Sequence, residues 1–424
     1  MNTRFEVHPF PSGLTMVLAA MPDMTSVSVG LWVAVGGRYE SVDLNGASHF
    51  IEHMLFKGTR RRSARAISQA VESLGGYLNA FTAEETTCFY AKAPHDHFAD
   101  VLDVLADMLL YSRFDPDDFG KEREVIKEEV AMYRDQPQLR VEELLNALQW
   151  PDQPLGRPLT GTEQSLDRLT PAGLLGYRRA HYVAPATCLA VAGRISRATC
   201  LRAATRLAAR FATGPRRSVV PVVIRPGGPL VRYARHRGEQ TQLALGVRTC
   251  SRHDERRYAL RLLNVLLGEN MSSHLFQALR EDTGLAYHVA STLSFFADTG
   301  DLVITAGLEP ANLERALELV LRELRRFQTR APGARELRAA RDYVIGQMAL
   351  SLENSEHQMM SVGEQWLGHG RLFSPATLQR HLARVTAAEV QAVARDFLRP
   401  ERLNLALVGP ERPHRRVSRL LGRL

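Results

Sequence analysis

LTPAGLLGYRRAHYVAPATCLAVAG, residues 169–193, and VTAAEVQAVARDFLRPERLNLALVG, residues 385–409, share one pattern at an offset of 216 residues. In both stretches a Thr precedes a helical pattern, where it is a plausible N-cap, and a short apolar strand then ends at a Gly. A further pair of segments, 89–93 and 304–308, has the same strand-then-helix pattern at nearly the same offset. The chain therefore has the pattern of a duplication.

Each copy alternates strands with long helices, and adjacent strands often lack a helix between them. This arrangement favours an α+β class, with two duplicated α/β domains that each contain a mixed or antiparallel sheet and packed helices. Pro and Gly concentrate between the copies, in GPRR at 214–217 and PGGP at 226–229, which is typical of an interdomain linker. We expect domains at 1–212 and 231–424, joined by a linker at 213–230.

Bulk composition narrows the class of protein. A chain of 424 residues with 45% hydrophobic content is larger than one hydrophobic core usually supports, which favours two or more domains. We find neither a signal peptide nor an apolar run long enough to span a membrane. Four scattered cysteines argue against a disulfide framework or a thiolate metal site. The net charge of +8 is spread along the chain. We expect a cytoplasmic protein without nucleic-acid or membrane partners.

A metal-binding pattern stands near the start of the first copy, in HFIEH at 49–53. Residues four apart lie on one face of a helix, so His49 and His53 can reach one ion, and Glu52 projects beside them. H-x-x-E-H is a signature of zinc peptidases. The alternative is an ordinary helix with one buried and one surface histidine.

A catalytic zinc site needs a third protein ligand and leaves one position for water. In EREVIKEEV at 122–130, Glu122, Val125, Ile126 and Glu129 share one helix face. Because a carboxylate on an apolar face is costly unless it is paired or ligating, Glu129 is the preferred third ligand and Glu122 the acceptor for a histidine N–H. Glu128 is the competing ligand, turned about 100° from that face.

The sequence resembles the insulinase/pitrilysin family of metallopeptidases, most closely its shorter branch, which includes the mitochondrial processing peptidase and its bacterial relatives. Besides HFIEH and Glu122 to Glu129, the matching segments are GRYE at 37–40, MLFKGT at 54–59, LNAFT at 78–82 and REDTGLAY at 280–287. The resemblance implies two related domains, zinc in the first, and paired subunits that close as a clamshell. The second copy has no ligand set at the corresponding positions, 264–268 and near Met348, so we expect it to form a chamber wall.

The resemblance also implies a mechanism and a substrate class. Glu52 would act as the catalytic base, and Arg280 and Tyr287 would hold the developing oxyanion or the substrate backbone. We expect peptides or unstructured segments to bind as an extended strand beside 77–82, with Asn79, Ala80, Phe81 and Thr82 in contact. An ordinary interior strand is the alternative.

Two other functions stay open at this stage. A non-catalytic assembly subunit would normally lack the complete metal set, which this chain has. One active half of a heterodimer is the other alternative to the expected homodimer. The sequence thus predicts a zinc-dependent endopeptidase.

Overall fold

The computed structural model describes residues 3–224, 227–422 and 424. The chain forms two compact units, each discontinuous in sequence. Unit 1 contains Met1–Val130, Arg157–Val220 and Ala349–Phe373, and unit 2 contains Ala131–Gly156, Pro221–Met348 and Ser374–Leu424. Within the described ranges no helix is long and apolar enough to cross a membrane.

Unit 1 is built on a six-stranded mixed sheet with the order β1-β2-β6-β3-β5-β4. β2 runs parallel to β6, and the other neighbours are antiparallel. β4 therefore forms one edge of the sheet. The strands are β1 (Arg4–Pro9), β2 (Thr15–Ala20), β3 (Ser26–Val33), β4 (Tyr77–Thr82), β5 (Thr87–Pro94) and β6 (Thr187–Gly193).

Unit 2 is built on a five-stranded sheet with the order β7-β11-β8-β10-β9. Its pairs, parallel for β7 with β11 and antiparallel for the rest, repeat those of β2-β6-β3-β5-β4. The predicted α+β class with two related domains and mixed sheets is confirmed. The strands are β7 (Leu230–Arg235), β8 (Thr241–Thr249), β9 (Ala286–Phe295), β10 (Gly300–Leu308) and β11 (Leu403–Gly409).

Helices cover both faces of each sheet. In unit 1 they are α1 (Ala47–Leu55), α2 (Ala64–Glu72), α3 (Phe98–Tyr111), α4 (Pro116–Asp135), which ends in unit 2, α6 (Glu163–Arg168), α7 (Pro171–His181), α8 (Arg197–Ala208) and α13 (Ser355–His369). In unit 2 they are α5 (Pro137–Gln149), α9 (Arg257–Asn264), α10 (His274–Phe276), α11 (Leu313–Thr329), α12 (Ala334–Ser351), which ends in unit 1, α14 (Pro375–Arg384), α15 (Ala387–Phe397) and α16 (Arg415–Leu421).

The two segments that predicted the duplication occupy equivalent places. Thr170 caps α7 and Thr386 caps α15, each by accepting a hydrogen bond from the backbone N–H three residues on. The strands that follow are β6 and β11, which hold the same position in the two sheets. Of the predicted linker 213–230, residues 213–224 and 227–229 carry no helix or strand, and Arg225 and Pro226 lie outside the described residues.

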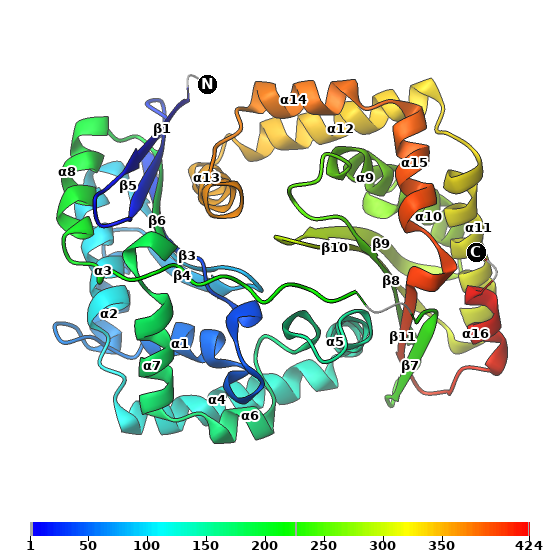
Figure 1. The fold of residues 1–424 in the computed structure, drawn as a ribbon, viewed down its shortest axis with the longest axis horizontal. Coiled ribbons are helices and arrows are strands. Elements are labelled where there is room, and N and C mark those ends of the chain that lie inside the picture. The colour runs from blue at the N-terminus through cyan, green and yellow to red at the C-terminus, as the bar shows by residue number, and fades with distance from the viewer. Residues whose placement is uncertain (1–2, 225–226, 423) are drawn as a thin grey trace. The chain divides into compact units, whose positions relative to one another are not determined.

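Helices α5 and α13 hold equivalent places in the two units, but each comes from the half of the sequence that forms most of the other unit. α5, from the first half of the sequence, packs on β8 and β11 of unit 2, and α13, from the second half, packs on β2, β3 and β6 of unit 1. Figure 1 shows α13 in orange beside the strands from the start of the chain. Each unit therefore needs a helix from the other half of the sequence to cover its sheet.

Alternation along β3 shows how unit 1 is layered. Val27, Val29 and Leu31 face the core with α1 and α3, whereas Trp32 faces a second core that contains Met359 of α13.

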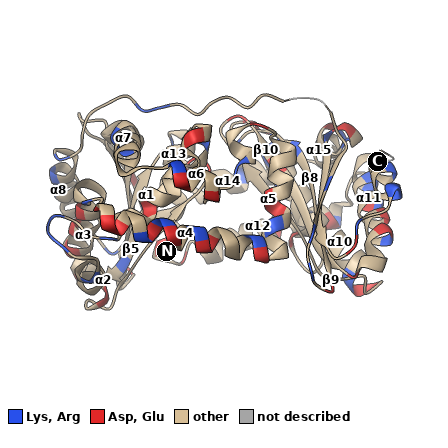
Figure 2. Ribbon diagram, turned by 90° about the horizontal axis from the view of Figure 1, so that it is seen from below, with Lys and Arg blue, Asp and Glu red and all other residues tan. Residues whose placement is uncertain are grey.

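Acidic and basic residues are interspersed along α4 and α11, as Figure 2 shows.

Candidate metal centre

α1 carries the first part of the centre and is anchored at its start by a buried carboxylate. Glu40 accepts hydrogen bonds from the backbone N–H groups of Gly46, at 2.8 Å, and Ser48, at 2.7 Å. Burial raises the pKa of Glu40 to about 7, although these two N–H groups favour its ionised form. Gly46 adopts a φ of +94°, and an added Cβ would lie 2.8 Å from the Thr160 carbonyl oxygen. The helix can therefore begin only with glycine at this position without strain.

The amphipathic pattern of α1 sets the direction of its polar side chains. Phe50, Ile51 and Met54 are fully buried in the core, so the remaining face carries His49, Glu52 and His53, which are all partly buried. The predicted spacing thus places both imidazoles and the carboxylate on one side of the helix.

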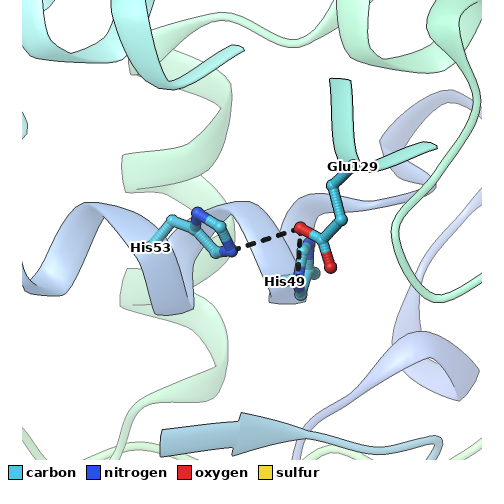
Figure 3. A group of neighbouring side chains, drawn as sticks. All are labelled: His49, His53 and Glu129. Atoms are coloured by element: carbon cyan, nitrogen blue, oxygen red, sulfur yellow. Dashed lines mark ion pairs between the residues drawn. The ribbon is translucent and has the colours of Figure 1, made fainter. Parts of the chain in front are cut away.

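Glu129 of α4 meets the two histidines. Its Oε2 lies 3.7 Å from Nε2 of His49 and 3.7 Å from Nε2 of His53, as Figure 3 shows. Ligand atoms around a tetrahedral zinc ion are about 3.3 Å apart, given bonds of about 2.0 Å. The three ligand atoms lie within 4.8 Å of one another. Two imidazole nitrogens and one carboxylate oxygen at this spacing fit a zinc ion, and three protein ligands leave its fourth position for a water.

His49 is in a state suited to metal binding. Burial, and secondarily the neighbouring His53 ring, lowers the pKa of His49 to about 4, so that its imidazole is neutral at neutral pH. Metal binding requires neutral imidazole. The Nδ1 atom of His49 is buried and has no hydrogen-bond partner among the described residues.

Glu122 contacts the ring nitrogen of His53 that faces away from Glu129. Its Oε1 lies 2.8 Å from Nδ1 of His53, and its Oε2 lies 2.5 Å from Nζ of Lys57. Burial opposes ionisation of Glu122, but the hydrogen bonds from His53 and Lys57 outweigh it and lower its pKa. An ionised acceptor at Nδ1 directs Nε2 of His53 toward Glu129. Lys57 was not predicted as part of the site, because it lies beyond the end of α1 at Leu55 and helical spacing does not place it.

One part of the helix-face prediction for α4 was wrong. Ile126 and Glu122 are buried, but Val125 is 46% exposed, because only the narrower i, i+4 and i+8 stripe of α4 faces the core. Glu128 is exposed, whereas Glu129 is partly buried beside the histidines.

Strand β4 contacts Glu52 through Thr82. The Thr82 hydroxyl donates a hydrogen bond to Oε2 of Glu52 at 2.6 Å. Burial raises the pKa of Glu52, and the Thr82 hydrogen bond opposes this shift. β4 pairs with β5 alone among the described strands, so it is an edge strand and the interior-strand alternative is wrong. The Ala83 N–H donates to the Thr86 carbonyl, so alternation along the antiparallel pair directs the Ala80 N–H away from β5. It donates instead to the Asn79 side-chain oxygen at 2.8 Å.

Arg280 and Tyr287 lie together in unit 2. The Arg280 guanidinium lies 5.0 Å from the centre of the Phe276 ring and 5.3 Å from that of Tyr287. Tyr287, near the start of β9, is 79% exposed. Across residues 3–224, 227–422 and 424, His49, His53 and Glu129 form the one group of three or more potential metal-binding side chains within this spacing.

Known proteins with similar sequences support this description. Residues 15–163 match the family model of insulinase, peptidase family M16, and residues 168–344 match that of the peptidase M16 inactive domain. An uncharacterized zinc protease of Mycobacterium leprae is 34% identical, with 97% of this chain and 93% of that protein covered. One of Bacillus subtilis is 35% identical, with 94% of this chain and 97% of that protein covered.

Solved structures share the fold. A peptidase M16 inactive domain from Pseudomonas fluorescens superimposes with a TM-score of 0.90 at 18% identity, covering 98% of this chain and 100% of the other. A protease from Helicobacter pylori also gives 0.90 at 18% identity, with 96% and 100% covered. The predicted resemblance is confirmed, and the chain belongs to the insulinase family, peptidase family M16.

Proposed function

We propose that this protein is a zinc-dependent endopeptidase that cleaves peptides or unstructured protein segments. The observation that carries the proposal is the meeting of His49, His53 and Glu129, with the Glu52 carboxylate beside them on the same helix. Relatives that are at least 34% identical over nearly the whole chain are named zinc proteases, which supports the same metal and reaction class.

In the proposed reaction His49, His53 and Glu129 hold the ion, and Glu122 fixes the His53 ring. Bound zinc would polarise the scissile carbonyl and lower the pKa of a coordinated water. Glu52 accepts the proton from the attacking water and returns it to the leaving amine. Its partial burial, which raises its pKa, suits a group that both takes and gives a proton.

The edge strand β4 supports an extended mode of substrate binding. The Ala80 N–H points away from β5 and is covered by the Asn79 side chain, which a peptide carbonyl could replace. Asn79, Ala80, Phe81 and Thr82 would contact the peptide. Main-chain pairing accepts varied sequences, because each residue offers the same N–H and C=O groups.

We further propose that the working enzyme is a closed pair of chains, in which Arg280 and Tyr287 of one chain serve the metal centre of its partner. Peptides are the expected ligands, and we expect neither nucleic acid nor membrane to bind. A heterodimer with a related chain, or a non-catalytic assembly role, are the competing functions. The cytoplasmic location stays a prediction.

One experiment tests the catalytic proposal. A mixed peptide library is incubated with the zinc-loaded protein, with the chelator-treated protein, and with the Glu52→Gln variant, and the products are identified by mass spectrometry. We expect cleavage by the zinc-loaded protein alone, with about one zinc per chain in both the wild type and the variant. Absence of cleavage by the zinc-loaded homodimer would favour a non-catalytic role or a missing partner chain. Cleavage that survives metal removal would overturn the proposal.

A further inference from the structure

Thr82 makes a contact that its predicted role in substrate binding does not require. Its hydroxyl lies 2.6 Å from Oε2 of Glu52, which is the usual distance for a hydroxyl donating to an ionised carboxylate. The two residues are 30 positions apart and come from different elements, β4 and α1. The contact therefore arises from the packing of the edge strand on the catalytic helix.

The strand register fixes which way Thr82 points. Side chains alternate between the two faces of a strand. Leu78 and Ala80 pack against the core that contains α1, whereas Phe81 packs against the core on the opposite face. Thr82 has the parity of Leu78 and Ala80, so its side chain faces α1. Backbone pairing of Thr82 with Thr87 holds that register.

The chemistry of the two side chains divides their roles. A Thr hydroxyl does not act as a base near neutral pH, but it is a donor on a β-branched side chain with restricted χ1. Glu52 has three rotatable side-chain bonds and needs one oxygen directed at the water. A donor on Oε2 fixes the carboxylate plane and leaves the proton-accepting role to Oε1.

We propose that Thr82 is a positioning residue, whose hydroxyl orients the Glu52 carboxylate for proton transfer. The inference rests on the proposed peptidase function and assigns Thr82 a second role beside the contact of its backbone with substrate. Strand β4 is also the proposed peptide-binding edge. The same strand would therefore bind the substrate and orient the catalytic base.

Steady-state kinetics of Thr82 variants tests this role. Thr82→Val keeps the shape of the side chain but removes the donor, and Thr82→Ser keeps the donor. We expect Thr82→Val to lower kcat by about 10- to 100-fold with KM changed less than about twofold, since misplaced catalytic groups cost rates of this order. Thr82→Ser should stay within about threefold of wild type. Thr86→Val, in the turn that follows β4, is the matched control and should behave as wild type.

Two further readouts exclude a general structural effect. Zinc content and thermal midpoint of Thr82→Val should match those of Thr86→Val.

The outcomes separate this inference from the proposed function. If the wild-type protein shows no chelator-sensitive cleavage, the proposed function and the role of Thr82 fall together. If the wild type is active and Thr82→Val keeps its kcat, or Thr82→Ser loses as much as Thr82→Val, the positioning role alone is overturned. A rise in KM with unchanged kcat would assign the hydroxyl to peptide binding instead.

Discussion

His53 and Glu122 are joined at 2.8 Å through the imidazole nitrogen that faces away from Glu129. The Glu122 carboxylate also contacts Nζ of Lys57 at 2.5 Å. Lys57, Glu122 and His53 are therefore joined by a continuous series of polar contacts. This relationship fixes which ring nitrogen is available to the metal and leads to a prediction about affinity.

Glu122→Gln should weaken zinc binding by about 10- to 100-fold, because the amide is a poorer acceptor for the His53 N–H and no longer balances Lys57. Competition against a chromophoric chelator gives the dissociation constant. Glu124→Gln, on the exposed side of α4, is the matched control and should leave it unchanged. Equal affinities in the two variants would show that Glu122 does not support the ligand.

The third ligand can be separated from its neighbour in the sequence. Glu129→Gln should remove most of the bound zinc, since it replaces the carboxylate whose Oε2 lies 3.7 Å from both histidines. Glu128→Gln changes an exposed residue and should retain zinc at the wild-type level. Metal analysis after gel filtration measures both. The reverse ranking would move the ligand by one position and contradict the geometry of Figure 3.

Docking of α13 on the sheet of unit 1 depends on a glycine. A Cβ at Gly363 would lie 2.3 Å from Nε1 of the buried Trp32 ring, whereas one at Gly346 of α12 would meet nothing within 4 Å. Gly→Ala within an open helix stabilises a protein by about 0.5 to 1 kcal/mol. We therefore expect Gly346→Ala to raise the thermal midpoint.

Gly363→Ala should lower the thermal midpoint, because overpacking typically costs about 1 to 3 kcal/mol and exceeds the gain in helix propensity. Thermal unfolding followed by circular dichroism compares the two variants. An increase for both would mean that Trp32 moves freely and that the fit of α13 is loose.

The sequence predicted those parts of the protein that depend on local spacing. His49 and His53 meet because an α-helix repeats every 3.6 residues, and Glu129 was preferred over Glu128 for the same reason. The structure brings these groups together. The two related units could be predicted because Thr170 and Thr386 begin equivalent helices, and N-capping is a local property.

Features that depend on tertiary packing could not be predicted. The patterns of α5 and α13 indicate amphipathic helices, but nothing local specifies which sheet each one covers, and their exchange between units followed only from the structure. Val125 lies within a helical apolar pattern, yet the breadth of the buried stripe depends on what α4 packs against. The contact of Thr82 with Glu52 joins a strand to a helix, and no spacing in the sequence indicates it.

The last prediction concerns the proposed pairing of chains. Tyr287 is 79% exposed, and Arg280 stacks on its ring, so both present polar atoms at the surface of unit 2. If they serve the partner's metal centre, a His49→Ala chain still offers the pair and a Tyr287→Phe chain still offers the metal.

Mixed dimers of these two variants should have about half of wild-type activity, because each mixed dimer has one complete site of two. Peptidase assays on dimers isolated with two different affinity tags measure the recovery. Co-expression of His49→Ala with Glu52→Gln is the control, since both changes damage the same half of the site and no pairing rebuilds it. Recovery in the first pair alone would support sites shared between subunits. Its absence in proven mixed dimers would mean that Arg280 and Tyr287 act within their own chain or take no part in catalysis.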